Sequence, residues 1–160
     1  MSDETLSGRA RVEADAASRG LKVRIVKRQE AGSLHEAARL LGLPPSGIVK
    51  TLVVKRHGGD YLFALVPGGR KISWPKLRAL VEVNKLSMPD AAVARDATGY
   101  ERGTITPLGS STPWPVYADE SIVGAEIAMG SGEHGYSAFV DADSLLSAFG
   151  AVVADITDPE

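Results

Sequence analysis

Two apolar segments separated by a short turn constrain the fold of this chain more than any other feature. Residues 48–55 and 61–66 are rich in Val, Leu and Ile, and each has the length of an ordinary strand. Between them, Gly58-Gly59-Asp60 supplies residue types that tight turns favour. The pattern predicts a β-hairpin around which the rest of the chain is arranged.

Helical and strand-like segments alternate irregularly along the rest of the chain. Helices are predicted over 1–19, over 34–41 behind the capping box of Ser33 and Glu36, from Ser73-Pro75 to about Val81, from Asp90 to before Gly99, and over 143–149. Further strands are predicted over 22–27, 116–118, 125–129, 136–140 and 151–155. This mixture indicates an α/β (mixed α+β) domain over residues 1–160, with a strongly curled mixed sheet surrounded by helices.

Composition removes several classes of protein. The chain has no Cys, so disulfides, thiolate metal sites and cysteine nucleophiles are excluded. Its three His residues, His35, His57 and His134, share no metal-ligand spacing. No phosphate-binding P-loop and no G-x-S-x-G motif occurs. No apolar segment approaches the roughly 18 residues that span a membrane, so a cytoplasmic protein is expected.

The net charge of −2 conceals a strong asymmetry. Residues 1–102 contain all 18 Lys and Arg and 11 acidic residues, a local charge of +7, whereas residues 103–160 contain nine acidic residues and no Lys or Arg. Residues 50–78 alone carry seven basic residues and one acid, Asp60. Such clustering is consistent with a basic face that meets phosphates and equally with a solvated surface.

Residues 130–135, Gly-Ser-Gly-Glu-His-Gly, match the dinucleotide fingerprint G-x-G-x-x-G. The context argues against that function, because a strand rather than a helix follows and too little chain remains for the other half of the fold. Glycines also permit a close approach of the backbone to a ligand. A plain hairpin turn and the wall of a pocket both fit the motif, and His134 is the His most suited to a functional role.

Lys50 begins one face of an otherwise apolar strand, in Ile48-Val49-Lys50-Thr51-Leu52. Such a lysine either extends to water from an edge or places a fixed positive charge inside a pocket. Later in the chain, residues 99–109 form a polar, glycine-rich segment that contains G-x-x-x-P from Gly103 to Pro107. A rigid loop of this kind can direct backbone N–H groups toward an oxyanion.

Taken in order, the lysine strand, the segment 98–109 and the glycine loop 130–135 resemble the YbaK-like family of trans-editing aminoacyl-tRNA deacylases, freestanding relatives of the prolyl-tRNA synthetase editing domain. The resemblance covers about residues 20–156, so the predicted helix over 1–19 lies outside the best-matching region. It implies a single α/β domain with a mixed, barrel-like sheet. It also implies hydrolysis of the ester between a wrong amino acid and a tRNA, without a metal or an organic cofactor. Small amino acids such as Ala, Cys, Ser or Thr are the expected substrates.

The resemblance also implies roles for individual residues. Lys50, Gly103, Gly132 and His134 would be catalytic, with Thr51, Thr104, Thr106, Pro107, Gly130 and Ser131 binding the substrate. The basic residues Lys55, Arg56, Arg70, Lys71, Lys76 and Arg78 would contact tRNA phosphates. Trp74, Tyr100 or Trp114 would either stack on a base of the acceptor end or pack in the core. Prolyl-tRNA synthetase or another synthetase is a candidate partner.

The chain departs from the family pattern at two places. Some members have a Tyr in the strand that corresponds to residues 22–28, and this chain has none there. Some have an acid just after the glycine loop, where this chain has Tyr136-Ser137. These positions bear on amino-acid specificity.

Two other functions are also consistent with the sequence: a non-catalytic module that binds tRNA or a synthetase, and a hydrolase of small esters or amides.

Overall fold

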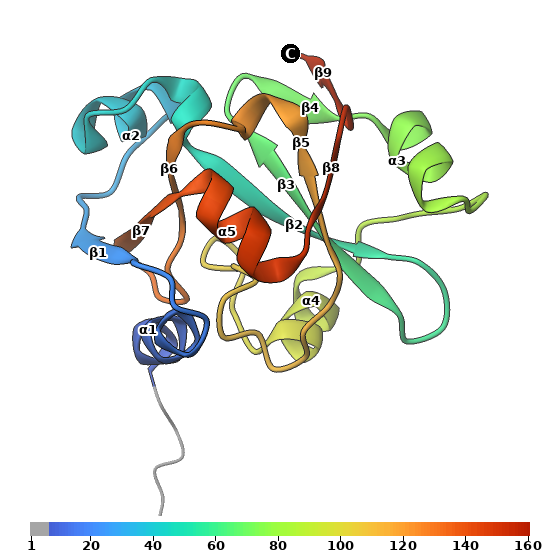
Figure 1. Ribbon diagram of the computed structural model, residues 1–160, viewed down its shortest axis with the longest axis horizontal. Helices are drawn as coiled ribbons and strands as arrows, with labels where there is room; N and C mark the ends of the chain where they lie inside the picture. The colour runs from blue at the N-terminus through green and yellow to red at the C-terminus, as the bar shows by residue number, and fades with distance from the viewer. Residues whose placement is uncertain (1–6) are drawn as a thin grey trace, which may run out of the picture.

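The computed structural model describes residues 7–160, and the first part of the helix predicted over 1–19 lies outside them. The predicted hairpin is confirmed: β2 (Val49–Lys55) pairs antiparallel with β3 (Tyr61–Pro67) (Figure 1). In the connecting turn the Asp60 N–H donates to the His57 carbonyl at 3.0 Å. Phe63 and Leu65 of β3 are fully buried, which is why this hairpin forms the centre of the molecule.

Two sheets of the fold meet at the start of the hairpin. One has the order β2-β3-β5-β8, in which β5 (Val116–Asp119) and β8 (Val152–Ala154) run parallel to β3. The other has the order β1-β7-β6 and is antiparallel, with β1 (Arg24–Lys27), β7 (Tyr136–Asp141) and β6 (Glu126–Gly130). A single parallel bridge between Ile48 and Ala128 joins them. The predicted mixed α/β fold is confirmed, and the curled sheet does not close into a barrel.

Within residues 7–160, five α-helices surround the sheets (Figure 1), together with the 3₁₀ turns η2 (Pro45–Gly47) and η3 (Glu120–Ile122). They are α1 (Gly8–Ser18), α2 (Leu34–Leu41), α3 (Trp74–Val81), α4 (Ala91–Thr98) and α5 (Ala142–Phe149). The predicted caps account for their bounds: Ser33 accepts from Glu36 N–H, and Asp90 accepts from Val93 N–H. Gly42 and Gly99 end α2 and α4 in the left-handed conformation.

The core has two parts, one on each side of the hairpin sheet. The larger lies between the two sheets and includes Phe63, Leu65 and Ile127. The smaller packs under α3 and includes Leu62 and Leu77.

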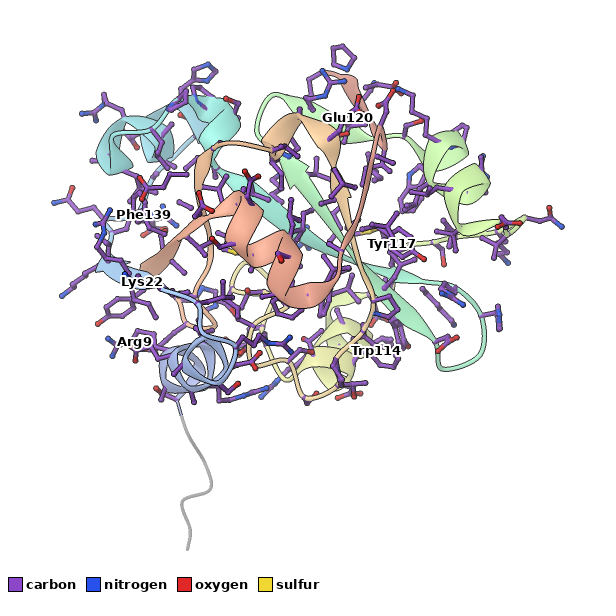
Figure 2. All side chains as sticks on the ribbon, viewed as in Figure 1. Arg9, Lys22, Trp114, Tyr117, Glu120 and Phe139 are labelled. Carbon is purple, nitrogen blue, oxygen red and sulfur yellow. The ribbon has the colours of Figure 1, made fainter. Side chains whose placement is uncertain are left out.

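The three aromatic residues considered for base stacking contact these clusters: Tyr100 is 2% exposed, Trp114 donates to the Ala97 carbonyl beside α4 (Figure 2), and Trp74 packs with the smaller cluster. Their surroundings favour the packing alternative.

A third, two-stranded sheet was not predicted. It pairs β4 (Arg70–Ile72) antiparallel with β9 (Thr157–Pro159). Both strands are short and largely polar, so no alternating apolar pattern marks them. Their anchor is Asp119 at the end of β5, which is 1% exposed and accepts hydrogen bonds from Ile156 N–H at 3.1 Å and Thr157 Oγ1 at 2.9 Å. One buried carboxylate thereby fixes the C-terminal strand.

Replacing Asp119 by alanine is expected to lower the free energy of unfolding by about 3 kcal/mol, because buried donors lose a charged acceptor. Burial alone would raise the pKa of Asp119, but hydrogen bonds from Ser121, Ile156 and Thr157 hold it below the usual value of 3.8. A carboxyl with a lowered folded-state pKa stabilises the fold above its unfolded pKa and loses that contribution as the pH falls through the folded value.

Denaturant unfolding of the wild type and Asp119→Ala at several pH values checks this expectation. The difference between the two should be complete near neutrality and should shrink below about pH 4. A difference that stays constant into strong acid would contradict the assigned role of the ionised carboxylate.

Candidate active site

The candidate site lies along the edge of β2 that faces away from β3. At the two ends of the hairpin, Gly68 N–H donates to the Ile48 carbonyl and Arg56 N–H donates to the Asp60 carbonyl. Alternate residues of an antiparallel strand bond to the same neighbour, so the backbone groups of Thr51 and Val53 point to the other side. On that side β2 is bridged to Ala128 at Ile48 and to Ser87 at Lys55. Between the two bridges the strand edge is open.

A cavity of about 680 Å³ occupies this opening, a size typical of ligand sites. Its wall combines β2 with α2, the segment before α4, the 99–109 segment, β6 and the start of β7. The lining residues from outside β2 are Arg28, Ala37, Leu41, Ile48, Met88–Ala91, Ala94, Arg102, Gly103, Ile105, Ala128–Gly130, Tyr136 and Ser137. The cavity therefore exists because β2 and β6 diverge after a single bridge.

Lys50 lines this cavity and is also exposed to solvent. It therefore combines the two predicted alternatives, a lysine that reaches water from a strand edge and a positive charge in a pocket. Two further cations line the same cavity. Arg28 is held by a 3.0 Å hydrogen bond from its Nε to Ser137 Oγ, and Arg102 is exposed. Of the described residues that line the cavity, Asp90 alone carries a carboxylate, and it caps α4. The wall thus carries an excess of positive charge that suits an anionic ligand.

The two glycine-bearing loops meet at the cavity. Gly103, Ile105 and Gly130 line it, and Gly132 N–H donates to the Thr104 carbonyl at 2.9 Å. Gly130 lies so close to the other loop that an added Cβ would stand 2.3 Å from the Ile105 carbonyl oxygen. Only glycine permits this approach. The structure therefore brings Lys50, Gly103 and Gly130 together around one cavity.

The predicted substrate-binding residues fall into two groups. Thr51 lines the cavity, and its Oγ1 is buried without a hydrogen-bond partner among the described residues. The others support the loops: Thr104 Oγ1 donates to Glu101, Thr106 Oγ1 accepts from Leu108, and Ser131 Oγ donates to Glu133 and Tyr136. Pro107 is buried and lines a separate shallow groove against α1. Direct substrate contacts by these loop residues stay a prediction.

His134 is placed at the tip of the glycine loop, outside the cavity wall. Its side chain is 66% exposed, and its Nε2 lies 3.3 Å from Glu101 Oε1 on the neighbouring loop. Gly132 also faces away from the cavity, toward α1. Neither Gly132 nor His134 lines the cavity, and their catalytic roles stay predictions.

The six residues predicted to contact tRNA lie outside the cavity wall, and several engage other parts of the chain. Arg70 Nε donates to Thr157 Oγ1 at 2.6 Å. Lys76 Nζ lies 3.0 Å from carboxylate oxygens of both Asp155 and Asp158, and bonds to Asp158 and then Asp155 raise its pKa. Arg56 pairs with Asp60 at 3.7 Å, and the backbone of Lys55 bridges to Ser87. Lys71 is exposed to solvent, whereas Arg78 is half-buried. The tRNA role of these six stays a prediction.

Sequence reasoning missed the Arg28–Ser137 pair as part of the site. The register of β1 on β7 brings Arg28 beside Ser137, and no local pattern in either segment marks the pair. Both residues line the cavity, and Ser137 belongs to Tyr136-Ser137, one of the two places where the chain departs from the family pattern.

Among residues 7–160, no helix is long and apolar enough to cross a bilayer. The same part of the chain contains no cluster of three potential metal ligands of the His, Cys, Asp or Glu type.

Comparisons with known proteins give a consistent result. The family profile for the aminoacyl-tRNA editing domain matches residues 28–148. The Enterococcus faecalis protein named "Putative Cys-tRNA(Pro)/Cys-tRNA(Cys) deacylase EbsC" is 28% identical over 129 residues, covering 80% of this chain and 79% of that protein. The proline–tRNA ligase of Desulfovibrio desulfuricans is 35% identical over 94 residues, which are 59% of this chain but only 16% of the ligase. A crystal structure titled as a "putative trans-editing enzyme for prolyl tRNA synthetase" superposes with a TM-score of 0.87 at 28% identity, covering 96% of this chain and 99% of that one.

Proposed function

This chain belongs to the aminoacyl-tRNA editing domain family, and we propose that it hydrolyses the ester of tRNAs that carry a small wrong amino acid such as Ala, Cys, Ser or Thr. The observation that carries the proposal is the cavity at the open edge of β2. There a lysine and two close-packed glycine loops face one space of ligand size. Acting on tRNA, the protein would work in the cytoplasm, with prolyl-tRNA synthetase or another synthetase as a candidate partner.

The proposed reaction is direct attack of water on the ester carbonyl, without an acyl-enzyme. The water oxygen bonds to the carbonyl carbon, the bond to the ribose oxygen breaks, and that oxygen leaves as a hydroxyl. Lys50 stabilises the negative charge that develops on the carbonyl oxygen, together with backbone N–H groups near Gly103 and Gly130. A neighbouring ribose hydroxyl of the tRNA can relay the proton from water to the leaving oxygen.

Two features of the wall would act on the amino acid. Thr51 Oγ1 is a buried polar atom available to a ligand, since buried hydroxyls in proteins are normally hydrogen-bonded. Arg28, held by Ser137, places a guanidinium on the wall. A pocket of this kind sieves the product of a synthetase, whose own site discriminates a methylene by only about 1–3 kcal/mol.

The charge of the cavity wall predicts where the tRNA end binds. Replacing Arg102 by alanine removes an exposed cation from the wall, and should weaken tRNA binding several-fold and reduce the slope of log K against log salt by about 0.7–0.9. Lys76→Ala removes the same charge from the cluster with Asp155 and Asp158. It should lower the melting temperature and weaken tRNA binding less than Arg102→Ala does, because the two carboxylates already offset the charge of Lys76.

Salt titrations of tRNA binding with both variants check this expectation. A larger loss of affinity for Lys76→Ala than for Arg102→Ala would place the tRNA on the α3 side of the molecule, as the charge distribution of the sequence alone would allow.

A panel of mischarged tRNAs tests the proposed function itself. Deacylation of tRNAs with small amino acids, unchanged by a chelator, supports a metal-independent editing enzyme. Binding without turnover across the whole panel would show a non-catalytic module, and hydrolysis of free esters without any need for tRNA would show a small-molecule hydrolase. Either of the last two results overturns the proposal.

A further inference from the structure

We infer that α1, which precedes the matched residues 28–148, is a positioning element that holds both glycine-bearing loops behind the cavity, and that Arg11 is its central positioning residue. The inference rests on the proposed function in so far as the two loops serve the deacylation. Figure 1 shows α1 beneath the turn between β6 and β7 and beside the loops that follow α4. The helix therefore contacts the side of these loops that faces away from the cavity.

Arg11 ties together the two ends of the 99–109 segment. Its Nη2 donates to the Gly109 carbonyl at 2.6 Å and to the Thr98 carbonyl at 3.2 Å, while its Nη1 donates to the Gly99 carbonyl at 3.3 Å. The same guanidinium lies 4.5 Å from the centre of the Tyr100 ring. A planar group with several fixed donors can hold carbonyls on both sides of a loop, which a lysine ammonium on a flexible stem does less well. Arg11 thus closes the loop that presents Gly103 to the cavity.

Other contacts join the same helix to the rest of the two loops. Asp15 Oδ2 accepts a hydrogen bond from Gly109 N–H at 2.8 Å. The backbone of Gly8 packs directly on the backbone of Gly132, where a Cβ on Gly8 would stand 1.7 Å from the Gly132 carbonyl oxygen. Arg9 forms an ion pair with Glu133 at 3.2 Å and lies 3.9 Å from the ring centre of Tyr136, on the side of α1 toward β1 and β7 (Figure 2).

The interior of the 99–109 segment depends on the same cluster. Tyr100 is 2% exposed, and its hydroxyl donates to the Leu108 carbonyl at 2.6 Å. Burial, slightly offset by Arg11, raises the pKa of Tyr100 to about 12, so the hydroxyl keeps its proton for this bond at any physiological pH. An added Cβ at Gly109 would stand 2.5 Å from that hydroxyl and 2.8 Å from the Arg11 backbone. Helix and loop are therefore packed as one unit.

The position of the Gly103 backbone relative to Lys50 should affect the rate of the proposed deacylation. A displacement of about 1 Å can reduce a rate about 100-fold even when it originates away from the chemistry. The 99–109 segment contains no α-helix or strand of its own, and α1 supplies hydrogen-bond partners to the carbonyls of Gly99 and Gly109 and to the N–H of Gly109. Loss of Arg11 should let the backbone around Gly103 move relative to Lys50 while the cavity and the tRNA-binding surface persist.

The experiment compares Arg11→Ala and Arg11→Lys with two controls on the same helix. Glu13→Ala changes an exposed residue, and Val12→Ala truncates a fully buried one that belongs to the core and forms no polar contact with either loop. For Arg11→Ala we expect kcat for deacylation to fall by about 10- to 100-fold with KM within about twofold of the wild type. Arg11→Lys should recover part of the loss, and added guanidinium at low, non-denaturing concentration should restore part of the kcat of Arg11→Ala.

Amide hydrogen exchange provides a readout that does not need activity. In Arg11→Ala, exchange should accelerate over residues 101–109 and 130–135, whereas in Val12→Ala any acceleration should follow the loss of global stability. Equal kcat losses in Arg11→Ala and Val12→Ala at matched stability, or unchanged exchange of both loops in Arg11→Ala, would overturn the inference. If the wild type deacylates no tRNA, the proposed function fails, and the exchange result still decides whether α1 holds the loops.

Discussion

Replacing Lys50 by alanine should reduce kcat for deacylation of a mischarged tRNA by about 100- to 1000-fold, the usual effect of removing one group that stabilises a developing oxyanion. Lys50 is the cation that β2 contributes to the cavity wall, which the loops of Gly103 and Gly130 also line. In the proposed mechanism, negative charge that develops on the carbonyl oxygen in the transition state would lose the stabilising charge of Lys50. Because Lys50 is exposed, the free energy of unfolding should change by less than about 0.5 kcal/mol.

The matched control is Lys85→Ala, which removes an exposed lysine outside the cavity wall. It should deacylate like the wild type. Lys50→Arg keeps the charge but changes the shape of the donor, and we expect activity between those of the wild type and Lys50→Ala. Single-turnover rates with saturating enzyme separate the chemical step from tRNA binding. Deacylation by Lys50→Ala at the wild-type rate would remove this residue from the mechanism.

Local patterns in the sequence predicted most of the elements in the fold. The bounds of α2, α3 and α4 agree with prediction to within a residue, because each is set by a cap whose hydrogen bond is local, such as Ser33 to Glu36 N–H. The β4–β9 pair was missed for the opposite reason. Its anchor is a carboxylate, Asp119, that lies 38 residues before Thr157, and no local pattern carries that contact.

The residues of the candidate site could be predicted only in part from local sequence, as could the elements of the fold. The order of the three motifs indicated Lys50, Gly103 and Gly130, and the structure places all three at one cavity. The cavity itself depends on where β2 and β6 diverge, which is a property of the tertiary fold. The pairing of Arg28 with Ser137 depends on the register of β1 and β7. Neither feature has a counterpart in a single segment of sequence.

The charge asymmetry has a different meaning once the fold is known. Several basic residues of the first part pair with acids of the second: Arg9 with Glu133, Arg70 with Asp119, and Lys76 with Asp155 and Asp158. The split of charge is therefore partly neutralised within the molecule. The cations that line the cavity, Lys50, Arg28 and Arg102, are the ones that favour an anionic ligand there. Charge counts along the chain could indicate a partner class but could not locate its surface.

Replacing Gly130 by alanine should abolish most of the deacylase activity, with a loss of about 100-fold or more, through the backbone rather than through any side chain. The new Cβ would stand 2.3 Å from the Ile105 carbonyl oxygen and 2.8 Å from that of Thr104. Real Cβ atoms do not approach so closely, so the two loops must separate. Because both loops line the cavity, their separation displaces the N–H groups proposed to face the oxyanion, and the overpacking should lower stability by about 1–3 kcal/mol.

Gly135→Ala is the control that separates loop displacement from backbone strain. Gly135 lies in the same loop as Gly130, but a side chain added there would not contact the other loop. Gly135 has a φ of +85°, so alanine there is strained by about 1–2 kcal/mol, but no atom lies within 4 Å of the added Cβ. The two variants should therefore lose similar stability, and only Gly130→Ala should lose most of its kcat. Measured unfolding free energies and single-turnover rates give both quantities. Equal activity in the two variants would mean that the contact between the loops does not matter for catalysis, and the oxyanion site would have to be sought elsewhere along the open edge of β2.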